Sequence, residues 1–204
     1  MAQIARYDLS RGCHVLIFNH KKFKNELNER KGSEKDLELL KIFFNNYQVN
    51  ELEIYSDFSV EQVKTKMAEI EKKDFKECSC LIVIIMSHGG LGDTIMASDE
   101  QSYNLETDIV DRVLDNSTLK DKPKLFFIQA CRGNALMETD SFPSVSNKND
   151  IWKLHSTYEG TVSFRDIERG TCFVQTLFDF IETNNDKSLH EISLLLRAEF
   201  KNHE

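Results

Sequence analysis

Two short, uninterrupted apolar runs constrain the fold of this chain more than any other feature. Residues 81–86 read Leu-Ile-Val-Ile-Ile-Met, and residues 124–128 read Leu-Phe-Phe-Ile after an initial lysine. Neither run alternates apolar with polar side chains, so each predicts a strand that is buried on both faces, as in a parallel sheet covered by helices. Further strands are predicted at 15–18, 51–55 and 151–157.

Segments with helical periodicity lie between these strands. Ser59 with Gln62, and Ser188 with Glu191, have the spacing of a helix-capping box, and Ser33 opens a similar segment. The predicted helices span residues 33–47, 59–70, 108–114, 173–181 and 188–200. Strands that alternate with helical crossovers predict a three-layer α/β fold, in which a mostly parallel central sheet lies between helices.

The size, charge and hydropathy of the chain exclude several classes of protein. Its 204 residues are 40% hydrophobic, which suits one sizeable domain, or at most two. A formal net charge of −8 argues against nucleic acid as a partner, because phosphate recognition needs a basic surface. No apolar run approaches the roughly 20 residues needed to span a bilayer, so no membrane association is expected.

The 5 cysteines of the chain form an odd set. The first ten residues lack the apolar core of a signal peptide, so we expect reduced thiols and a cytoplasmic location. Cys78 and Cys80 are separated by a single residue, but no second pair follows at zinc spacing. Buried thiols are therefore favoured over a metal site.

His88 and Cys131 each lie just past the carboxyl end of a predicted strand. Ligands of parallel α/β sheets bind at this edge, so the two side chains converge if their strands are neighbours. A cysteine thiolate can attack a peptide carbonyl, and a histidine can hold its proton and later protonate the leaving amine. The main-chain N–H groups of Gly89 and Cys131 could donate to the developing oxyanion. Alone, each residue reads more simply as a buried thiol or a loop histidine, but together they favour cysteine-dependent peptide hydrolysis without a metal or other cofactor.

The residues around these two side chains resemble the caspase family. Residues 129–133, Gln-Ala-Cys-Arg-Gly, match the local signature of caspases, which also has a histidine upstream. Residues 16–20 resemble the first caspase strand and residues 163–166 a substrate-binding segment, so the resemblance covers nearly the whole chain. It implies a caspase-like three-layer fold, with a large-subunit-like region at 1–140 and a small-subunit-like region at 141–204.

The resemblance implies a cysteine endopeptidase that cleaves proteins after aspartate, in apoptosis or a related proteolytic cascade. In such an enzyme Arg30, Gln129 and Arg165 would hold the carboxylate of the substrate aspartate. Guanidinium groups suit this role because they bind a carboxylate through two parallel hydrogen bonds, whereas lysine acts as a point charge. Ser163 and Phe164 would line the neighbouring subsites.

Two further residues take a role only through the resemblance. The main-chain carbonyl of Asn28 corresponds to the group that orients the catalytic histidine. Asp140 lies in the linker between the two subunit-like regions and resembles a processing site, with Ser141 after the cut. The expected partners are protein substrates with an exposed aspartate and caspase inhibitor proteins.

The sequence also departs from the family pattern. Gly90 stands where an acidic residue commonly follows the His-Gly pair, and Phe164 and Cys172 stand where many relatives have tryptophan, which leaves the subsites beyond aspartate open. The chain stops at Glu204, where relatives continue into a strand at the dimer interface. We therefore expect a catalytic domain shortened at its carboxyl end, lacking the last family strand and with a weakened family dimer.

Two other functions stay open at this point. A catalytically weak caspase-like regulator that binds a true caspase would fit the missing strand, although intact Cys131 and His88 argue against it. A metacaspase-like enzyme that cuts after basic residues would need acidic groups in its pocket, whereas Arg30 and Arg165 indicate an acidic substrate. Activity toward an aspartyl peptide separates these alternatives.

Overall fold

A five-stranded sheet forms the centre of the computed structural model, which describes residues 7–131, 150–156, 165–166 and 170–201. The strand order is β2-β1-β3-β7-β8, and every neighbouring pair is parallel. The strands are β1 (Cys13–Asn19), β2 (Val49–Ser56), β3 (Cys80–Met86), β7 (Lys124–Gln129) and β8 (Ile151–His155). All seven residues of β3 are buried, as its uninterrupted apolar sequence predicts.

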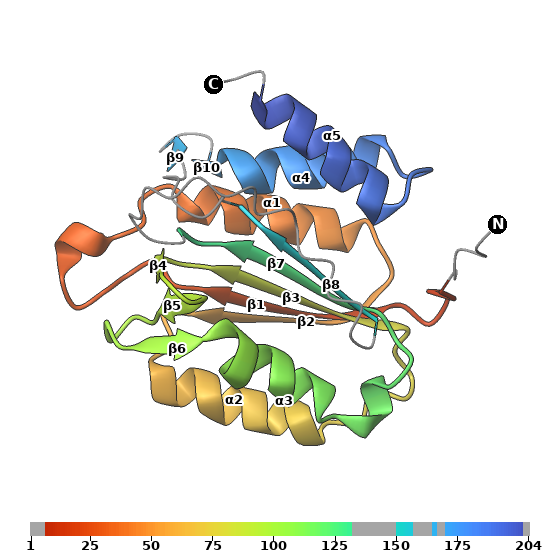
Figure 1. Cartoon of the computed structure of the whole chain (residues 1–204), viewed down its shortest axis with the longest axis horizontal. Coiled ribbons are helices and arrows are strands. Elements are labelled where there is room, and N and C mark those ends of the chain that lie inside the picture. The colour runs from red at the N-terminus through yellow and green to blue at the C-terminus, as the bar shows by residue number, and fades with distance from the viewer. Residues whose placement is uncertain (1–6, 132–149, 157–164, 167–169, 202–204) are drawn as a thin grey trace.

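Helices cover both faces of this sheet, which confirms the predicted three-layer α/β fold (Figure 1). One face carries α1 (Ser33–Asn45), α4 (Cys172–Thr183) and α5 (Leu189–Lys201). The other carries α2 (Val60–Lys72) and α3 (Asp111–Leu114), the latter continuing a π-helical segment at Leu105–Val110. Two short 3₁₀ turns lie at Glu26–Asn28 and Ser117–Leu119.

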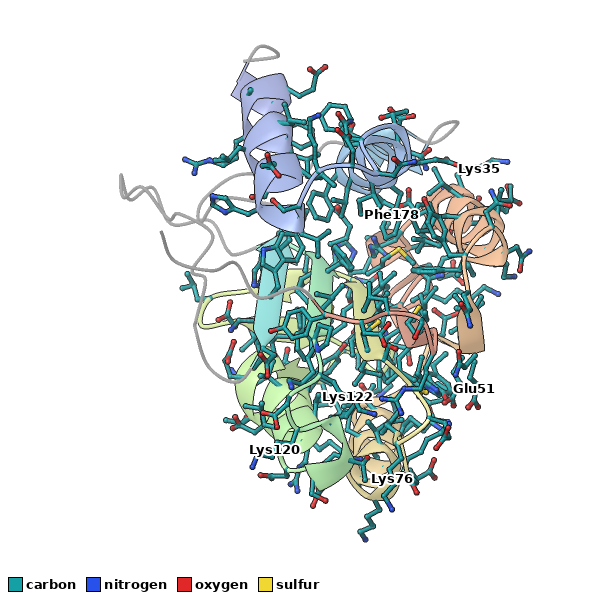
Figure 2. All side chains as sticks on the ribbon, turned by 90° about the vertical axis from the view of Figure 1, so that its right-hand side faces the viewer. Lys35, Glu51, Lys76, Lys120, Lys122 and Phe178 are labelled. Atoms are coloured by element: carbon teal, nitrogen blue, oxygen red, sulfur yellow. The ribbon has the colours of Figure 1, made fainter. Side chains whose placement is uncertain are left out.

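Aromatic side chains connect helices α1 and α4 to the sheet. The ring of Phe178 on α4 lies 4.8 Å from that of Phe43 on α1 and 5.6 Å from that of Phe127 on β7, measured between centroids. Figure 2 shows Phe178 within this helical layer, seen from the side on which the strands begin. Large buried rings of this kind contribute much of the apolar area that stabilises a domain core.

The helix starts follow the capping signals with one exception. Ser59 Oγ accepts from the N–H of Gln62 at 3.3 Å, and the Gln62 amide oxygen accepts from the N–H of Ser59 at 2.9 Å, which completes the predicted capping box. Ser188 and Glu191 make the same reciprocal pair before α5. Ser33 differs, because it is the first helical residue and Gly32, with φ 84°, precedes it.

Two small elements were not predicted. A three-stranded antiparallel sheet is made of β4 (Gly89–Gly90), β5 (Thr94–Met96) and β6 (Ser102–Asn104), and a hairpin pairs β9 (Arg165–Asp166) with β10 (Gly170–Thr171). Strands of two or three residues are too short to show an alternating pattern. Both elements lie at the carboxyl edge of the central sheet, on the left of Figure 1.

A few boundaries differ from the predictions. The helix predicted to reach Tyr47 ends at Asn45, and Tyr47 stacks on Phe43 from outside the helix with its side chain 42% exposed. Strand β8, which was predicted to run from 151 to 157, ends at His155. Among the residues that the structure describes, no helix combines the length and apolar character needed to cross a bilayer.

Candidate active site

The strands that precede His88 and Cys131 are direct neighbours. Met86, the last residue of β3, is in register with Gln129, the last residue of β7, and the N–H of Ser87 donates to the Gln129 carbonyl at 3.0 Å. The hydrogen bonds between β3 and β7 therefore continue one residue beyond the end of β3, and His88 and Cys131 leave the sheet next to each other. The condition set by the sequence, that the two strands be neighbours, is met.

Gly89 packs directly against the main chain at Cys131. A Cβ atom added at Gly89 would lie 2.3 Å from the Cys131 carbonyl oxygen and 3.0 Å from the Cβ of Ala130. Only glycine allows this approach, since real Cβ atoms are excluded at such distances. The segments that carry His88 and Cys131 are thus in van der Waals contact through their backbones.

The imidazole of His88 is oriented by a main-chain carbonyl. Its Nε2 lies 2.7 Å from the carbonyl oxygen of Asn28, so the contact predicted from the resemblance is present. A carbonyl only accepts, so the neutral ring carries its proton on Nε2 and keeps its basic lone pair on Nδ1. This tautomer suits a group that must take a proton from a nearby thiol.

Three features that hold His88 had not been identified from the sequence. The ring of Phe23 packs on the imidazole with centroids 5.0 Å apart, and the carbonyl of His88 accepts from the N–H of Met96 on β5 at 2.9 Å. Glu100 accepts from the side chain of Asn28 at 3.0 Å and so secures the residue whose carbonyl orients the ring. The contacts of Phe23 with His88 and of Glu100 with Asn28 join segments far apart in sequence, and the bond to Met96 belongs to a small sheet that no local pattern predicts.

Arg30, the first predicted pocket residue, lies at the same edge of the sheet. Its side chain is fully buried at 0% exposure, and its Nη1 donates to the carbonyl of His20 at 3.0 Å. His20 follows β1, and its own N–H donates to the Met86 carbonyl at the end of β3 at 2.9 Å. Gln129 is also buried, as the last residue of β7. Arg30 and Gln129 therefore flank the strand end that leads to His88.

The remaining site predictions are only partly covered by the structure. The backbone of Arg165 is described, as the first residue of β9, where it pairs with Thr171 of β10. Ser163, Phe164 and Asp140 lie outside the described residues. Their roles stay predictions.

Burial of His20 couples the stability of this edge to pH. Burial, reinforced by the charge of Arg30, lowers the pKa of His20 from 6.5 to about 4, although Asp57 and Asp99 act in the other direction. Below pH 6.5 His20 therefore binds a proton in the unfolded chain but not in the folded chain, so the free energy of unfolding falls until the pH reaches about 4. We expect this residue alone to cost roughly 2 kcal/mol between pH 7 and pH 5.

Urea unfolding at pH 7 and pH 5 tests this prediction. His20→Gln keeps a polar partner for the Tyr103 hydroxyl, which lies 3.1 Å from His20 Nε2, but cannot be protonated. The variant should lose roughly 2 kcal/mol less than the wild type over this range. An equal loss in both proteins would contradict the assignment to His20. Glu53 does not affect this comparison. Burial opposes its ionisation, but its two lysine partners lower its pKa to about 2, so its protonation destabilises the fold only at lower pH.

Within the part of the chain that the structure describes, one group of side chains has donor atoms close enough to hold a metal, and it lies away from this site. The donor atoms of His14, Glu51 and Glu53 are within 4.8 Å of one another. Lys73 already pairs with both carboxylates, at 2.7 and 3.0 Å, and Lys66 pairs with Glu53 at 2.8 Å. The group is therefore an ion-pair network that neutralises its own charge. Figure 2 places Glu51 at the end of the sheet where the strands begin.

The comparisons with known proteins agree with this arrangement. A family model described as the caspase domain matches residues 13–204. Human caspase-14 is 30% identical over 193 residues, which cover 85% of this chain and 76% of that protein. Caspase drICE from Drosophila melanogaster is 33% identical over 198 residues, covering 89% of this chain and 57% of the relative. The chain therefore belongs to the caspase family, whose members are cysteine proteases.

A solved structure supports the fold independently. The crystal structure of caspase-1 from Spodoptera frugiperda superimposes with a TM-score of 0.73 at 24% identity, covering 88% of this chain and 73% of that one. Chicken caspase-7 is 29% identical, and this chain spans 65% of its length. The curated relatives named here are thus matched over 57% to 76% of their own length.

Proposed function

We propose that this chain is a cysteine endopeptidase that cleaves proteins after aspartate, in apoptosis or a related proteolytic cascade. One observation carries the proposal: His88, held through Nε2 by the Asn28 carbonyl, leaves the sheet next to Cys131. All five cysteines are free thiols, which is expected in a reducing compartment and supports a cytoplasmic location.

The roles of the site residues follow from the chemistry of peptide hydrolysis. Cys131 attacks the scissile carbonyl as a thiolate, and the Nδ1 atom of His88 takes its proton and later gives it to the leaving amine. The N–H groups of Gly89 and Cys131 donate to the oxyanion of the tetrahedral intermediate. Water then attacks the thioester, with His88 as the base, and regenerates the free enzyme.

The preference for aspartate is supported by the position of Arg30. A fully buried guanidinium at the edge that leads to His88 provides a cation of low hydration, which favours a carboxylate partner. Arg165 and Gln129 complete the proposed pocket. An amide or a cation in this pocket would leave buried charge uncompensated, which costs on the order of several kcal/mol.

A small panel of peptides that differ only before the scissile bond tests the proposal. We expect strong turnover with aspartate, weaker turnover with glutamate because its extra methylene shifts the carboxylate, and almost none with asparagine or lysine. Equal rates with aspartate and asparagine would rule out the pocket. No turnover of any peptide, together with binding to an active caspase, would favour the regulator instead, and preference for lysine would favour a metacaspase-like enzyme.

Maturation by cleavage after Asp140 belongs to the same proposal. We expect the active protein to run as two pieces, corresponding to the large- and small-subunit-like regions, because the cut divides the chain between them. Asp140→Ala should remain a single chain, and Asp150→Ala provides a control at another acidic position of the same connection. Mass spectrometry of the purified proteins measures the termini. Two pieces with unchanged termini in Asp140→Ala would place the cut elsewhere.

A further inference from the structure

Asp36, in the first turn of α1, is a buried carboxylate outside the catalytic residues. It is 0% exposed, and its Oδ1 accepts from the N–H of Thr171 at 2.8 Å and from the side-chain amide of Gln175 at 3.2 Å. Burial raises the pKa of Asp36, while these hydrogen bonds and the charge of Arg30 favour the ionised form. Burying a carboxylate is costly, so its partners are expected to matter.

The partners on one side of Asp36 belong to the hairpin of β9 and β10. Thr171, whose N–H it binds, is directly opposite Arg165 in that hairpin. Gly170 adopts φ +93°, and a Cβ atom there would lie 2.4 Å from Asp36 Oδ1. Only glycine admits the carboxylate this close to the backbone. The hairpin that carries Arg165 therefore packs against Asp36 through Thr171 and Gly170.

Asp36 is also connected to Arg30 through the first turn of α1. The carbonyl of Arg30 accepts from the N–H of Ser33 at 3.2 Å, which joins it to the first turn of α1. Its positive charge acts on the carboxylate of Asp36, and its Nη1 is seated on the His20 carbonyl. Asp36 thus connects α1, whose first turn is hydrogen-bonded to Arg30, with the hairpin that carries Arg165.

We propose that Asp36 is a positioning residue that fixes the spacing between the segments of Arg30 and Arg165, and so sets the affinity for the substrate aspartate. This inference rests on the proposed function. Bidentate recognition of one carboxylate by two guanidinium groups needs both in fixed geometry, and a misplacement of about 1 Å is enough to cost much of the binding. Cys131 and His88 are held by other contacts, so their chemistry should not depend on Asp36.

Three variants test the inference. Asp36→Ala removes the acceptor and the charge, Asp36→Asn keeps an acceptor for Thr171 but removes the charge, and Asp179→Asn changes an exposed carboxylate on α4 as a control. We expect Asp36→Ala to raise KM for an aspartyl peptide roughly tenfold or more, with a much smaller change in kcat. Asp36→Asn should give a smaller rise in KM, and Asp179→Asn should match the wild type.

Two measurements that need no turnover separate positioning from a general loss of structure. The rate at which iodoacetamide alkylates Cys131 should be the same in all the variants, and amide hydrogen exchange at Thr171 should accelerate only in Asp36→Ala. Unchanged KM or unchanged exchange in Asp36→Ala would overturn the inference while an active wild type leaves the proposed function intact. A parallel fall in kcat and Cys131 reactivity would show that Asp36 is merely structural.

The remaining outcomes are also decisive. If Asp36→Ala does not fold, an unchanged KM in Asp36→Asn would overturn the inference and a raised KM would support it. If the wild type cleaves no aspartyl peptide, the proposed function fails and the pocket role of Asp36 fails with it. Exchange at Thr171 then still shows whether Asp36 holds the hairpin.

Discussion

Replacing Cys131 by alanine is expected to abolish turnover of aspartyl peptides while leaving the fold intact. The thiol is half-buried just after β7 and makes no disulfide, so its removal takes away the nucleophile but little packing. The loss in kcat should be about 10⁴-fold or more, as for the nucleophiles of other proteases. Peptide turnover and the thermal unfolding midpoint, measured on the same preparations, check both halves of the prediction.

His88→Ala should be nearly as damaging, and the double variant hardly worse than either single one. Residues that act as a unit give losses that do not add, because neither is useful without the other. A peptide ketone that alkylates thiols should label Cys131 before the remaining four cysteines, with the exposed Cys172 as the most demanding comparison. Preferential labelling of Cys172, or additive losses in the double variant, would contradict the pairing of Cys131 with His88.

The central layer of the fold could be predicted because burial on both faces leaves a strong local signal. A strand such as β3 has no polar residue between Cys80 and Met86, and the helices beside it show their apolar face at regular spacing. Strand order is different, because it depends on contacts across the chain. From the sequence, His88 and Cys131 were expected to meet only if their two strands are neighbours. The structure shows that these strands, β3 and β7, pair directly.

Some residues of the candidate site could likewise be predicted from local pattern, whereas others depend on contacts across the chain. Cys131 and His88 could be proposed from their places at strand ends, whereas Arg30 on local pattern alone resembles an ordinary surface arginine. The structure buries Arg30 completely, with its Nη1 hydrogen-bonded to the carbonyl of His20 just after β1. Phe23, Glu100 and the contact of Asp36 with the hairpin were missed because each acts through a partner distant in sequence. Side chains of this kind acquire a role only through tertiary packing.

Gly89→Ala is expected to disable the enzyme through the contact between the two catalytic segments. The added methyl group would lie 2.3 Å from the Cys131 carbonyl oxygen and 3.1 Å from that of Thr94, and both are main-chain atoms that cannot rotate away. The strand at Gly89 must therefore move, and with it the N–H proposed for the oxyanion and the adjacent His88. A shift of about 1 Å should lower turnover roughly 10²-fold, and overpacking should reduce stability by about 1–3 kcal/mol.

Gly90→Ala is the matched control, because it adds the same methyl group one residue further along. Its Cβ would lie 2.8 Å from Thr94 Oγ1, a side-chain atom that can turn aside and give up its 3.0 Å hydrogen bond to the Leu91 carbonyl. We expect Gly90→Ala to retain most of the wild-type turnover. Equal losses in the two variants would mean that any crowding of β4 is harmful. Full activity in Gly89→Ala would show that the close approach of Gly89 to Cys131 is not required for catalysis, because a segment that yields so easily cannot be what fixes the oxyanion donor.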